Sequence, residues 1–191
     1  MRIGILALQG AVGEHADSFT RLGASPVPIR RPDQLEDLDA IVLPGGESTT
    51  MSMLLESSEL FDPLQKRLED GLPALGTCAG MILLASDVLD GRADQRNFAV
   101  IDIAVRRNAW GRQVDSFEAD LDIEAIGHDP FPAVFIRAPR VERVGDRVEV
   151  LAAIHDEPVL CRSGSVVVAS FHPELSGDLR IHKLFLEGVR S

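Results

Sequence analysis

Residues 73–85 read PALGTCAGMILLA, and this segment carries the clearest signal of the fold class. Pro73–Gly76 predicts a short strand, and Ala79–Ala85 predicts a helix that begins directly behind it. Between the two, Gly76-Thr77-Cys78-Ala79-Gly80 has the spacing of a nucleophile elbow, with cysteine in place of serine. Glycine on each flank allows the chain to turn sharply without a Cβ clash. A strand that passes directly into a helix in this way is typical of α/β proteins.

The rest of the chain extends this reading in both directions. Before the elbow, strands are expected at Ile3–Leu8, Ser25–Ile29 and Ala40–Leu43, and helices at Gly13–Leu22, Ser48–Glu56 and Phe61–Asp70. After it, strands are expected at Ala99–Arg106, Phe117–Leu121, Ala133–Arg137, Arg147–Ile154, Pro158–Arg162 and Val166–Ser170, followed by a helix with an apolar stripe of Ile181, Leu184, Phe185 and Val189. We therefore expect one α/β domain over residues 1–191. It has a mostly parallel central sheet with helices on both faces and an antiparallel extension in the second half.

Composition limits the possible functions. The 191 residues carry a formal charge of −11, which disfavours binding to nucleic acid. Most of the acidic excess lies in the first half, so the second half has spare arginines that could bind a small anion or solvate a face. Two cysteines suggest a reducing compartment. The apolar run Ile3–Leu8 is too short for a signal peptide, and no stretch approaches the roughly 20 residues of a membrane span. We expect a cytoplasmic protein with no membrane contact.

Cys78 and His172 are the candidates for catalysis. The N-terminus of the helix behind Cys78 favours a thiolate and offers amide N–H groups to an oxyanion. Of the five histidines, only His172 has a suggestive setting, Phe171-His172-Pro173-Glu174. Pro173 favours an extended His172, and positions i and i+2 of an extended chain point to the same side. Glu174 can then orient the imidazole while the other ring nitrogen faces the thiol. The alternatives are a buried, inert Cys78 and a simple turn at His172; Cys161 is interpreted as structural.

A third candidate site is Pro44-Gly45-Gly46-Glu47-Ser48, at the end of the third expected strand. Two glycines let backbone N–H groups approach a ligand closely, so this loop could supply half of an oxyanion hole. The alternative is a plain turn in which Ser48 caps the following helix. The sequence has no metal-binding cluster, Walker-type phosphate loop or dinucleotide fingerprint, so no cofactor and no metal are expected.

Together these sites resemble the class I, triad-type glutamine amidotransferases, and more specifically the glutaminase subunit of pyridoxal 5′-phosphate synthase. The resemblance runs from about residue 3 to the last helix. It is carried by Leu8–Ala11, Pro44–Met51, Gly76–Gly80, Arg107–Gln113 with Ser116–Glu118, Phe135–Pro139 and Ser170–Glu174. The Arg107–Glu118 motif is the most specific of these, because the triad alone does not separate the subfamilies.

The resemblance implies a three-layer class I glutamine amidotransferase fold that hydrolyses L-glutamine to glutamate and ammonia. It implies catalysis by Cys78, His172 and Glu174, and an oxyanion hole formed by the N–H groups of Gly46 and Ala79. Glutamine would be bound by six residues, Gly46, Glu47, Ser48, Arg107, Ile136 and Arg137. The implied partner is a (β/α)₈-barrel synthase subunit that receives the ammonia for vitamin B6 biosynthesis.

Other functions remain open on the sequence. The nearest is a glutaminase that serves another pathway, such as imidazole glycerol phosphate or anthranilate synthesis; the Arg107–Glu118 motif argues against it. A non-catalytic glutamine-binding module would be signalled by loss of Cys78, His172 or Glu174, and all three are present. A cysteine hydrolase or chaperone of the related elbow-cysteine superfamily would lack the late His-Pro-Glu.

Overall fold

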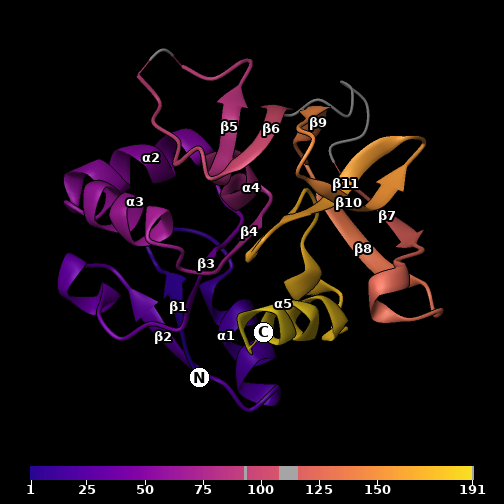
Figure 1. Ribbon diagram of the computed structural model, residues 1–191, viewed down its shortest axis with the longest axis horizontal. Coiled ribbons are helices and arrows are strands. Elements are labelled where there is room, and N and C mark those ends of the chain that lie inside the picture. Colours follow the sequence, from indigo (N-terminus) through magenta and orange to yellow (C-terminus); the bar gives the residue numbers. More distant parts are fainter. Residues whose placement is uncertain (93, 108–115, 191) are drawn as a thin grey trace.

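The computed structural model describes residues 1–92, 94–107 and 116–190. Its main element is a seven-stranded sheet in the order β10-β11-β12-β4-β3-β1-β2 (Figure 1). In chain order these strands are β1 (Arg2–Leu6), β2 (Ser25–Ile29), β3 (Ala40–Leu43), β4 (Ala74–Thr77), β10 (Glu149–Ile154), β11 (Glu157–Ser163) and β12 (Val166–Ala169). From β12 to β2 neighbouring strands are parallel, whereas β10–β11 and β11–β12 are antiparallel. The sheet is therefore mostly parallel with an antiparallel extension, as the sequence predicts.

Helices cover both faces of this sheet. All four residues of β3 are buried, and successive side chains enter different cores, as the two-residue period of a strand requires. Ile41 and Leu43 pack in one core with side chains of α2 (Ser48–Ser57), α3 (Phe61–Glu69) and α4 (Ala79–Leu84). Ala40 and Val42 pack in the other core with side chains of α1 (Val12–Arg21) and α5 (Arg180–Arg190). The three-layer arrangement follows from this double-sided burial.

Five strands form two smaller sheets beside the main one. β5 (Ala85–Val88), β6 (Ile101–Arg106) and β9 (Arg140–Val144) make a three-stranded sheet, and β7 (Ser116–Leu121) pairs with β8 (Phe131–Ile136). The 3-10 helices are η1 (Pro32–Leu35), η2 (Glu124–Ile126) and η3 (Pro173–Leu175). The sequence predicted β6, β7 and β8 but not β5 or β9. Of the strands that follow β4 in the described residues, only β10, β11 and β12 join the central sheet.

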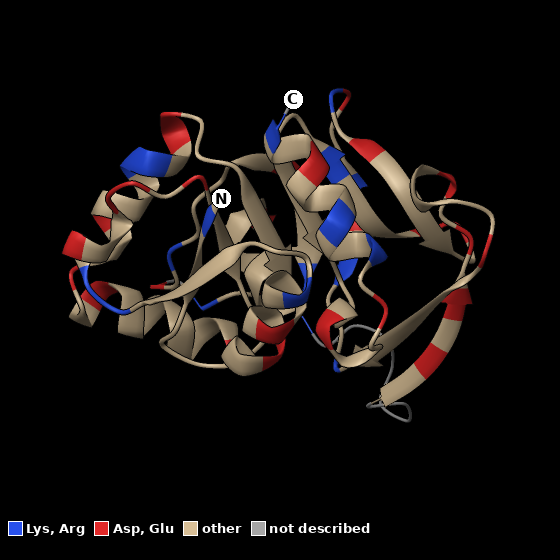
Figure 2. Ribbon diagram, turned by 90° about the horizontal axis from the view of Figure 1, so that it is seen from below, with Lys and Arg blue, Asp and Glu red and all other residues tan. Residues whose placement is uncertain are grey.

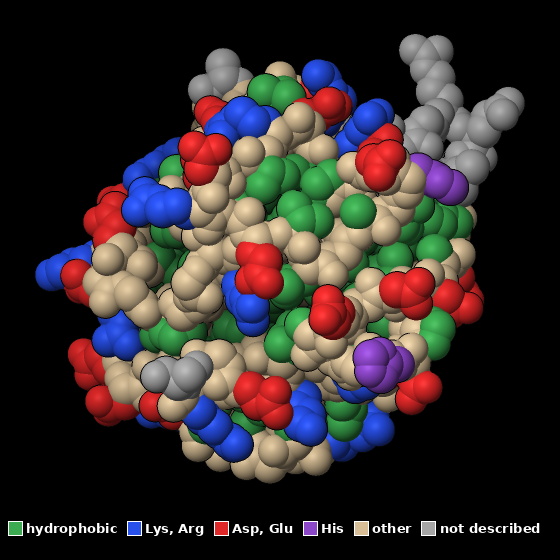
Figure 3. All heavy atoms as spheres, turned by 45° about the vertical axis from the view of Figure 1, so that its right-hand side comes forward, with side chains coloured by type: hydrophobic (Ala, Val, Ile, Leu, Met, Phe, Trp, Pro, Cys, Tyr) green, Lys and Arg blue, Asp and Glu red, His purple; other side chains and the backbone are tan. Residues whose placement is uncertain are grey.

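The surface is mixed in character. Acidic residues are spread over the outer helices and strands rather than gathered on one face (Figure 2). On the face drawn in Figure 3, hydrophobic side chains reach the surface between charged ones. Within the part of the chain that the structure describes, no helix is both long enough and apolar enough to cross a bilayer.

The carboxyl ends of four adjacent parallel strands place the functional loops. β12, β4, β3 and β1 are neighbours in the sheet and run in the same direction. The segments that leave them therefore meet at one edge, where ligands bind in open α/β sheets. These segments carry the Gly45-Gly46 loop, Cys78 and the His172–Glu174 pair.

Candidate active site

Cys78 lies on a strained turn between β4 and α4. Its φ is 49° and its ψ is −104°, a backbone conformation that residues other than glycine rarely adopt. The turn is fixed by a hydrogen bond from the Cys78 N–H to the Ala169 carbonyl at 2.8 Å. It also requires Gly80, because a Cβ atom there would clash with the Leu43 carbonyl oxygen. The elbow predicted from the sequence is confirmed, and it places Cys78 in the lining of a pocket.

His172 and Glu174 form the hydrogen bond that the sequence predicts. Nδ1 of His172 lies 2.8 Å from Oε1 of Glu174, and both residues are buried. The backbone conformation that brings the two residues together differs from the extended segment that was expected. His172 has φ −107° and ψ 84°, and the 3-10 helix η3 begins immediately after it at Pro173. The backbone N–H of His172 donates to the Val134 carbonyl at 2.8 Å, which ties the pair to β8.

The electrostatics of the pair favour an imidazolium beside a carboxylate. Burial opposes the charge on His172, but hydrogen bonds to Cys78 and Glu174, and the charges of both, raise the pKa of His172 to about 10. Burial also opposes the charge on Glu174, yet the hydrogen bond from His172 and the positive charge of the His172 ring leave the pKa of Glu174 below its ordinary value. Because Nδ1 of His172 is directed at Glu174, Nε2 is the ring nitrogen left for the Cys78 thiol.

A pocket of about 380 Å³ opens over Cys78 and His172. All six residues predicted to bind glutamine line it: Gly46, Glu47, Ser48, Arg107, Ile136 and Arg137. The carbonyl oxygen of Ile136 lies 3.8 Å from Sγ of Cys78, and Arg137 follows with φ 43°, which turns the chain at the pocket wall. Glu174 and Ala79 are buried and are not among the lining residues. Ala79 is the first residue of α4, so its N–H has no acceptor within that helix.

Glu47 is the N-cap of α2, and not Ser48, which the plain-turn alternative placed there. The Glu47 carboxylate accepts hydrogen bonds from the backbone N–H groups of Thr49 at 3.1 Å and Thr50 at 2.7 Å. Burial alone would raise the pKa of Glu47, but these bonds and the Thr50 hydroxyl lower it. Ser48 is the first residue of the helix. A carboxylate with a fixed charge therefore stands at the pocket edge.

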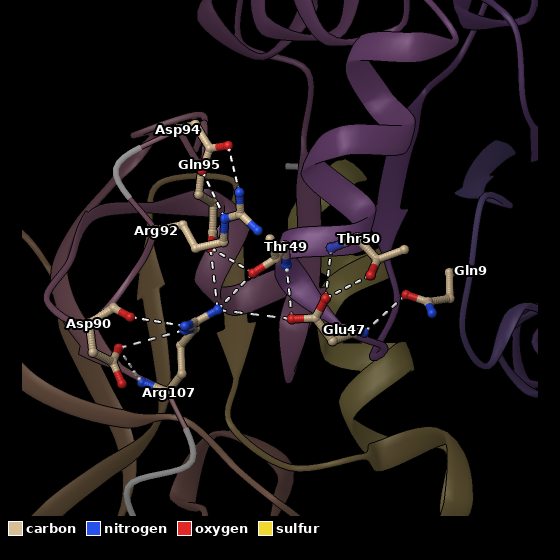
Figure 4. Close-up of polar contacts among 9 residues, drawn as sticks. All are labelled: Gln9, Glu47, Thr49, Thr50, Asp90, Arg92, Asp94, Gln95 and Arg107. Carbon is tan, nitrogen blue, oxygen red and sulfur yellow. Dashed lines mark hydrogen bonds and ion pairs between the residues drawn. The ribbon is translucent and has the colours of Figure 1, made fainter.

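Arg107 is held next to Glu47 by several partners (Figure 4). Its Nη1 lies 2.7 Å from the Thr49 hydroxyl and 3.9 Å from a Glu47 carboxylate oxygen. Its Nη2 donates to the Asp90 carbonyl at 2.9 Å, and its backbone N–H donates to the Asp90 carboxylate at 2.8 Å. Two of the residues predicted to bind glutamine, one basic and one acidic, thus already face one another. Residues 108–115 of the Arg107–Glu118 motif lie outside the described residues.

Gln9 and Gly10 line the same pocket, although the sequence indicates no role for them beyond the motif Leu8–Ala11. Oε1 of Gln9 accepts a hydrogen bond from the Glu47 N–H at 3.0 Å, which connects the loop after β1 to the Gly45-Gly46 loop (Figure 4). Cys161 takes no part in the pocket. It lies fully buried in β11, and burial raises the pKa of its thiol to about 12.

Comparison with known proteins identifies the family. Residues 5–191 match the SNO glutamine amidotransferase family. The chain belongs to this family. Among curated relatives, a protein of Frankia alni named pyridoxal 5′-phosphate synthase subunit PdxT is 58% identical over 190 residues, which cover 100% of this chain and 96% of the relative. A protein of the same name from Rhodococcus opacus is 57% identical over 195 residues, with 98% and 96% covered.

Solved structures agree with this membership of the SNO glutamine amidotransferase family. A crystal structure described as a glutamine amidotransferase superposes with a TM-score of 0.93 and 47% identity, and it covers 99% of both chains. The structure of PurLQS from Thermotoga maritima superposes with a TM-score of 0.68 at 16% identity, and that likeness concerns the fold alone. The class I glutamine amidotransferase fold expected from the sequence is confirmed.

Proposed function

We propose that this chain is the glutaminase subunit of pyridoxal 5′-phosphate synthase and that Cys78, His172 and Glu174 carry out the hydrolysis of L-glutamine. The observation that carries the proposal is the pocket over Cys78, in which a cysteine on a nucleophile elbow meets an imidazole held by a buried carboxylate. In this proposal, residues 1–191 form one glutaminase domain, and the domain needs no cofactor.

The reaction has two halves. The Cys78 thiolate attacks the side-chain amide carbon of glutamine, and the carbonyl oxygen becomes an oxyanion that the N–H groups of Gly46 and Ala79 stabilise. His172 gives its proton to the departing nitrogen, so the C–N bond breaks, ammonia leaves and a thioester remains. His172 then takes a proton from water, the hydroxide attacks the thioester, and glutamate leaves while the thiolate is restored. Glu174 holds the ring and supports its positive charge.

The pocket wall supplies groups for both charges at the α-carbon of the substrate. Arginine binds a carboxylate through two parallel N–H donors, so Arg107 and Arg137 suit the α-carboxylate of glutamine. The low pKa of Glu47 keeps it charged, and it suits the α-ammonium group. Binding of glutamine would exchange the 3.9 Å contact between Glu47 and Arg107 for contacts to the substrate's own opposite charges.

The partner follows from the chemistry of the product. Ammonia is protonated in bulk water and then no longer acts as a nucleophile, so it must pass directly into a water-excluded site. The relatives named subunit PdxT belong by name to a synthase of several subunits. We infer that the partner is the synthase subunit, built as a (β/α)₈ barrel, and that it receives the ammonia.

One experiment tests both parts. The tagged chain is expressed with and without the barrel synthase subunit and is then isolated. The formation of glutamate and of pyridoxal 5′-phosphate is measured with glutamine as the only nitrogen donor. We expect the two subunits to copurify and glutamine to support the formation of pyridoxal 5′-phosphate. Glutaminase activity without copurification would assign the chain to another amidotransferase. Glutamine binding without hydrolysis would identify a binding module.

A further inference from the structure

A buried polar cluster contacts Glu174, and none of its residues lines the pocket. It consists of His15 on α1, Thr77 at the end of β4 and His182 on α5. Both histidines have no exposed surface. Nδ1 of His15 lies 3.0 Å from Nε2 of His182, and Nε2 of His15 lies 3.2 Å from the Thr77 hydroxyl. The proposed mechanism uses neither histidine.

The cluster contacts Oε2 of Glu174, the carboxylate oxygen that the triad does not use. Oε1 of Glu174 accepts the hydrogen bond from His172, whereas Oε2 is buried without a hydrogen-bond partner among the described residues. Nε2 of His15 lies 3.4 Å from Oε2. An ionised carboxylate oxygen in a buried site needs a donor, because its desolvation is otherwise uncompensated.

Burial fixes the charge of both rings. It lowers the pKa of His15, an effect that the charge of Glu174 offsets only in part, and it lowers the pKa of His182 to about 3. Both imidazoles are therefore neutral at physiological pH. A neutral imidazole has one nitrogen that donates and one that accepts, so the contact between the two rings allows two arrangements.

In the first arrangement, Nε2–H of His182 donates to Nδ1 of His15, and the His15 proton sits on Nε2, where it faces Glu174 and Thr77. In the second, Nδ1–H of His15 donates to His182, and a nitrogen lone pair faces the carboxylate at 3.4 Å. The second also leaves an N–H at Nδ1 of His182, an atom that is buried without a partner among the described residues. An orphaned donor and a lone pair against a negative oxygen both cost free energy, so the first arrangement is favoured.

We propose that His15 is a positioning residue for Glu174, and that His182 sets the tautomer that gives it this role. The Nε2–H of His15, shared with the Thr77 hydroxyl, holds Oε2, so that Oε1 stays aimed at Nδ1 of His172. Such contacts are often long in a free enzyme and shorten as the transition state forms. Thr77 precedes Cys78, so the same proton ties the carboxylate to the base of the elbow. This inference rests on the proposed glutaminase function.

The test compares two substitutions of His15 in the complex with the synthase subunit. His15→Leu removes the donor, and we expect kcat for glutamine hydrolysis to fall about 10- to 100-fold, as for the loss of one hydrogen bond to a charged group, with KM nearly unchanged. His15→Gln places an amide N–H₂ near the former Nε2–H and should recover most of kcat. Phe185→Leu is the matched control, because Phe185 is as buried and packs on Phe19 in the same core but does not belong to the cluster.

Two results would overturn the inference. One is that His15→Leu and Phe185→Leu lower kcat by the same factor at the same loss of thermal stability, or that His15→Gln is no better than His15→Leu. The other comes from the wild-type protein, where ¹⁵N-resolved NMR of the imidazoles should show a proton on Nε2 of His15 and on Nε2 of His182. A proton on Nδ1 of His15 rejects the arrangement even if the variants do not fold. A wild-type complex that lacks glutaminase activity would instead reject the proposed function, because the NMR reads the ring protons without turnover.

Discussion

Gly45 lies so close to the imidazole ring of His172 that a single Cβ atom on Gly45 would clash with the ring. The two residues are far apart in the chain and follow different strands, β3 and β12. Their contact makes the backbone of the early glycine loop one wall of the space that the catalytic imidazole occupies. A change in this loop therefore acts on His172 directly.

Replacing Gly45 by alanine tests this contact. The added methyl group would displace the imidazole from its present position, so we expect Gly45→Ala to lower kcat by about 100-fold, the scale of a misplaced catalytic group. Gly13→Ala is the control, because a Cβ atom at Gly13 meets nothing within 4 Å. Steady-state glutaminase kinetics and thermal unfolding of both variants provide the measurement. Equal activity in the two variants would show that His172 has room to move.

The two cysteines give a second prediction. Cys78→Ala removes the proposed nucleophile and should lower kcat by a factor on the order of 10⁶, as for other enzymes that form a covalent intermediate. Cys161→Ala should leave kcat unchanged and cost about 1 kcal/mol of stability, because it only shortens a buried side chain. Glutamate release and partner binding are measured for both. The assignment of Cys78 fails if the two losses of activity are equal.

The central sheet was predictable because its strands carry strong local signals. Ala40-Ile41-Val42-Leu43 is buried on both faces, so it has an uninterrupted apolar run, and a Pro-Gly-Gly sequence ends it. β5 and β9 lack such a signal. Most residues of β5 (Ala85–Val88) and β9 (Arg140–Val144) are only partly buried or exposed, and both are rich in polar side chains. Their pairing depends on β6, which lies between them, and not on their own patterns.

The residues of the site also differ in whether their local sequence predicts their role. Cys78 and the pair of His172 and Glu174 carry local sequence signals, since the elbow and the His-Pro-Glu spacing constrain the backbone around them. His15 and His182 carry none, because they meet only when α1 and α5 pack on the same face of the sheet, 167 positions apart in the chain. Such a pair follows from tertiary packing, and nothing in either local sequence indicates it.

The charge of Glu174 gives a third prediction, which concerns pH. The hydrogen bond and charge of Glu174 help to raise the pKa of His172 to about 10. Glu174→Gln keeps the shape but removes the negative charge, so the imidazolium loses support and the pKa of His172 falls. We expect a large fall in kcat, a modest change in KM, and an alkaline limb of the pH–rate profile that moves to lower pH. An alkaline limb in the variant that coincides with that of the wild type would exclude this role for Glu174.

The two arginines of the pocket should act on glutamine binding. Arg137→Lys and Arg107→Lys replace a planar fork by a point charge, and each should raise KM for glutamine about tenfold, the cost of one weakened charged contact. Arg21→Lys is the control, because the Arg21 ion pair with Asp17 is exposed and neither residue lines the pocket. The measurement is the KM of each variant at saturating synthase. If KM is unchanged at both Arg107 and Arg137, neither residue binds the α-carboxylate.

The last prediction concerns Gly46 and the coupling of the two subunits. An uncoupled glutaminase would release ammonia to water, so the site should be completed only when the partner docks. A peptide next to glycine reorients at little steric cost, so the Gly46 N–H can turn toward the oxyanion on docking. We therefore expect the synthase to raise kcat, rather than only to lower KM.

Gly46→Val tests this coupling. A Cβ atom at Gly46 would lie 3.1 Å from the sulfur of Met51 and 3.2 Å from Oε1 of Gln9, both ends of flexible side chains, so the variant should fold and dock. Its branched side chain should nevertheless block reorientation of the peptide. The loss of one oxyanion donor predicts a kcat about 10²–10³-fold below that of the wild-type complex. Glutaminase kinetics with and without saturating synthase decide the matter: full activity of the isolated wild-type chain, unchanged by the partner, would reject the switch.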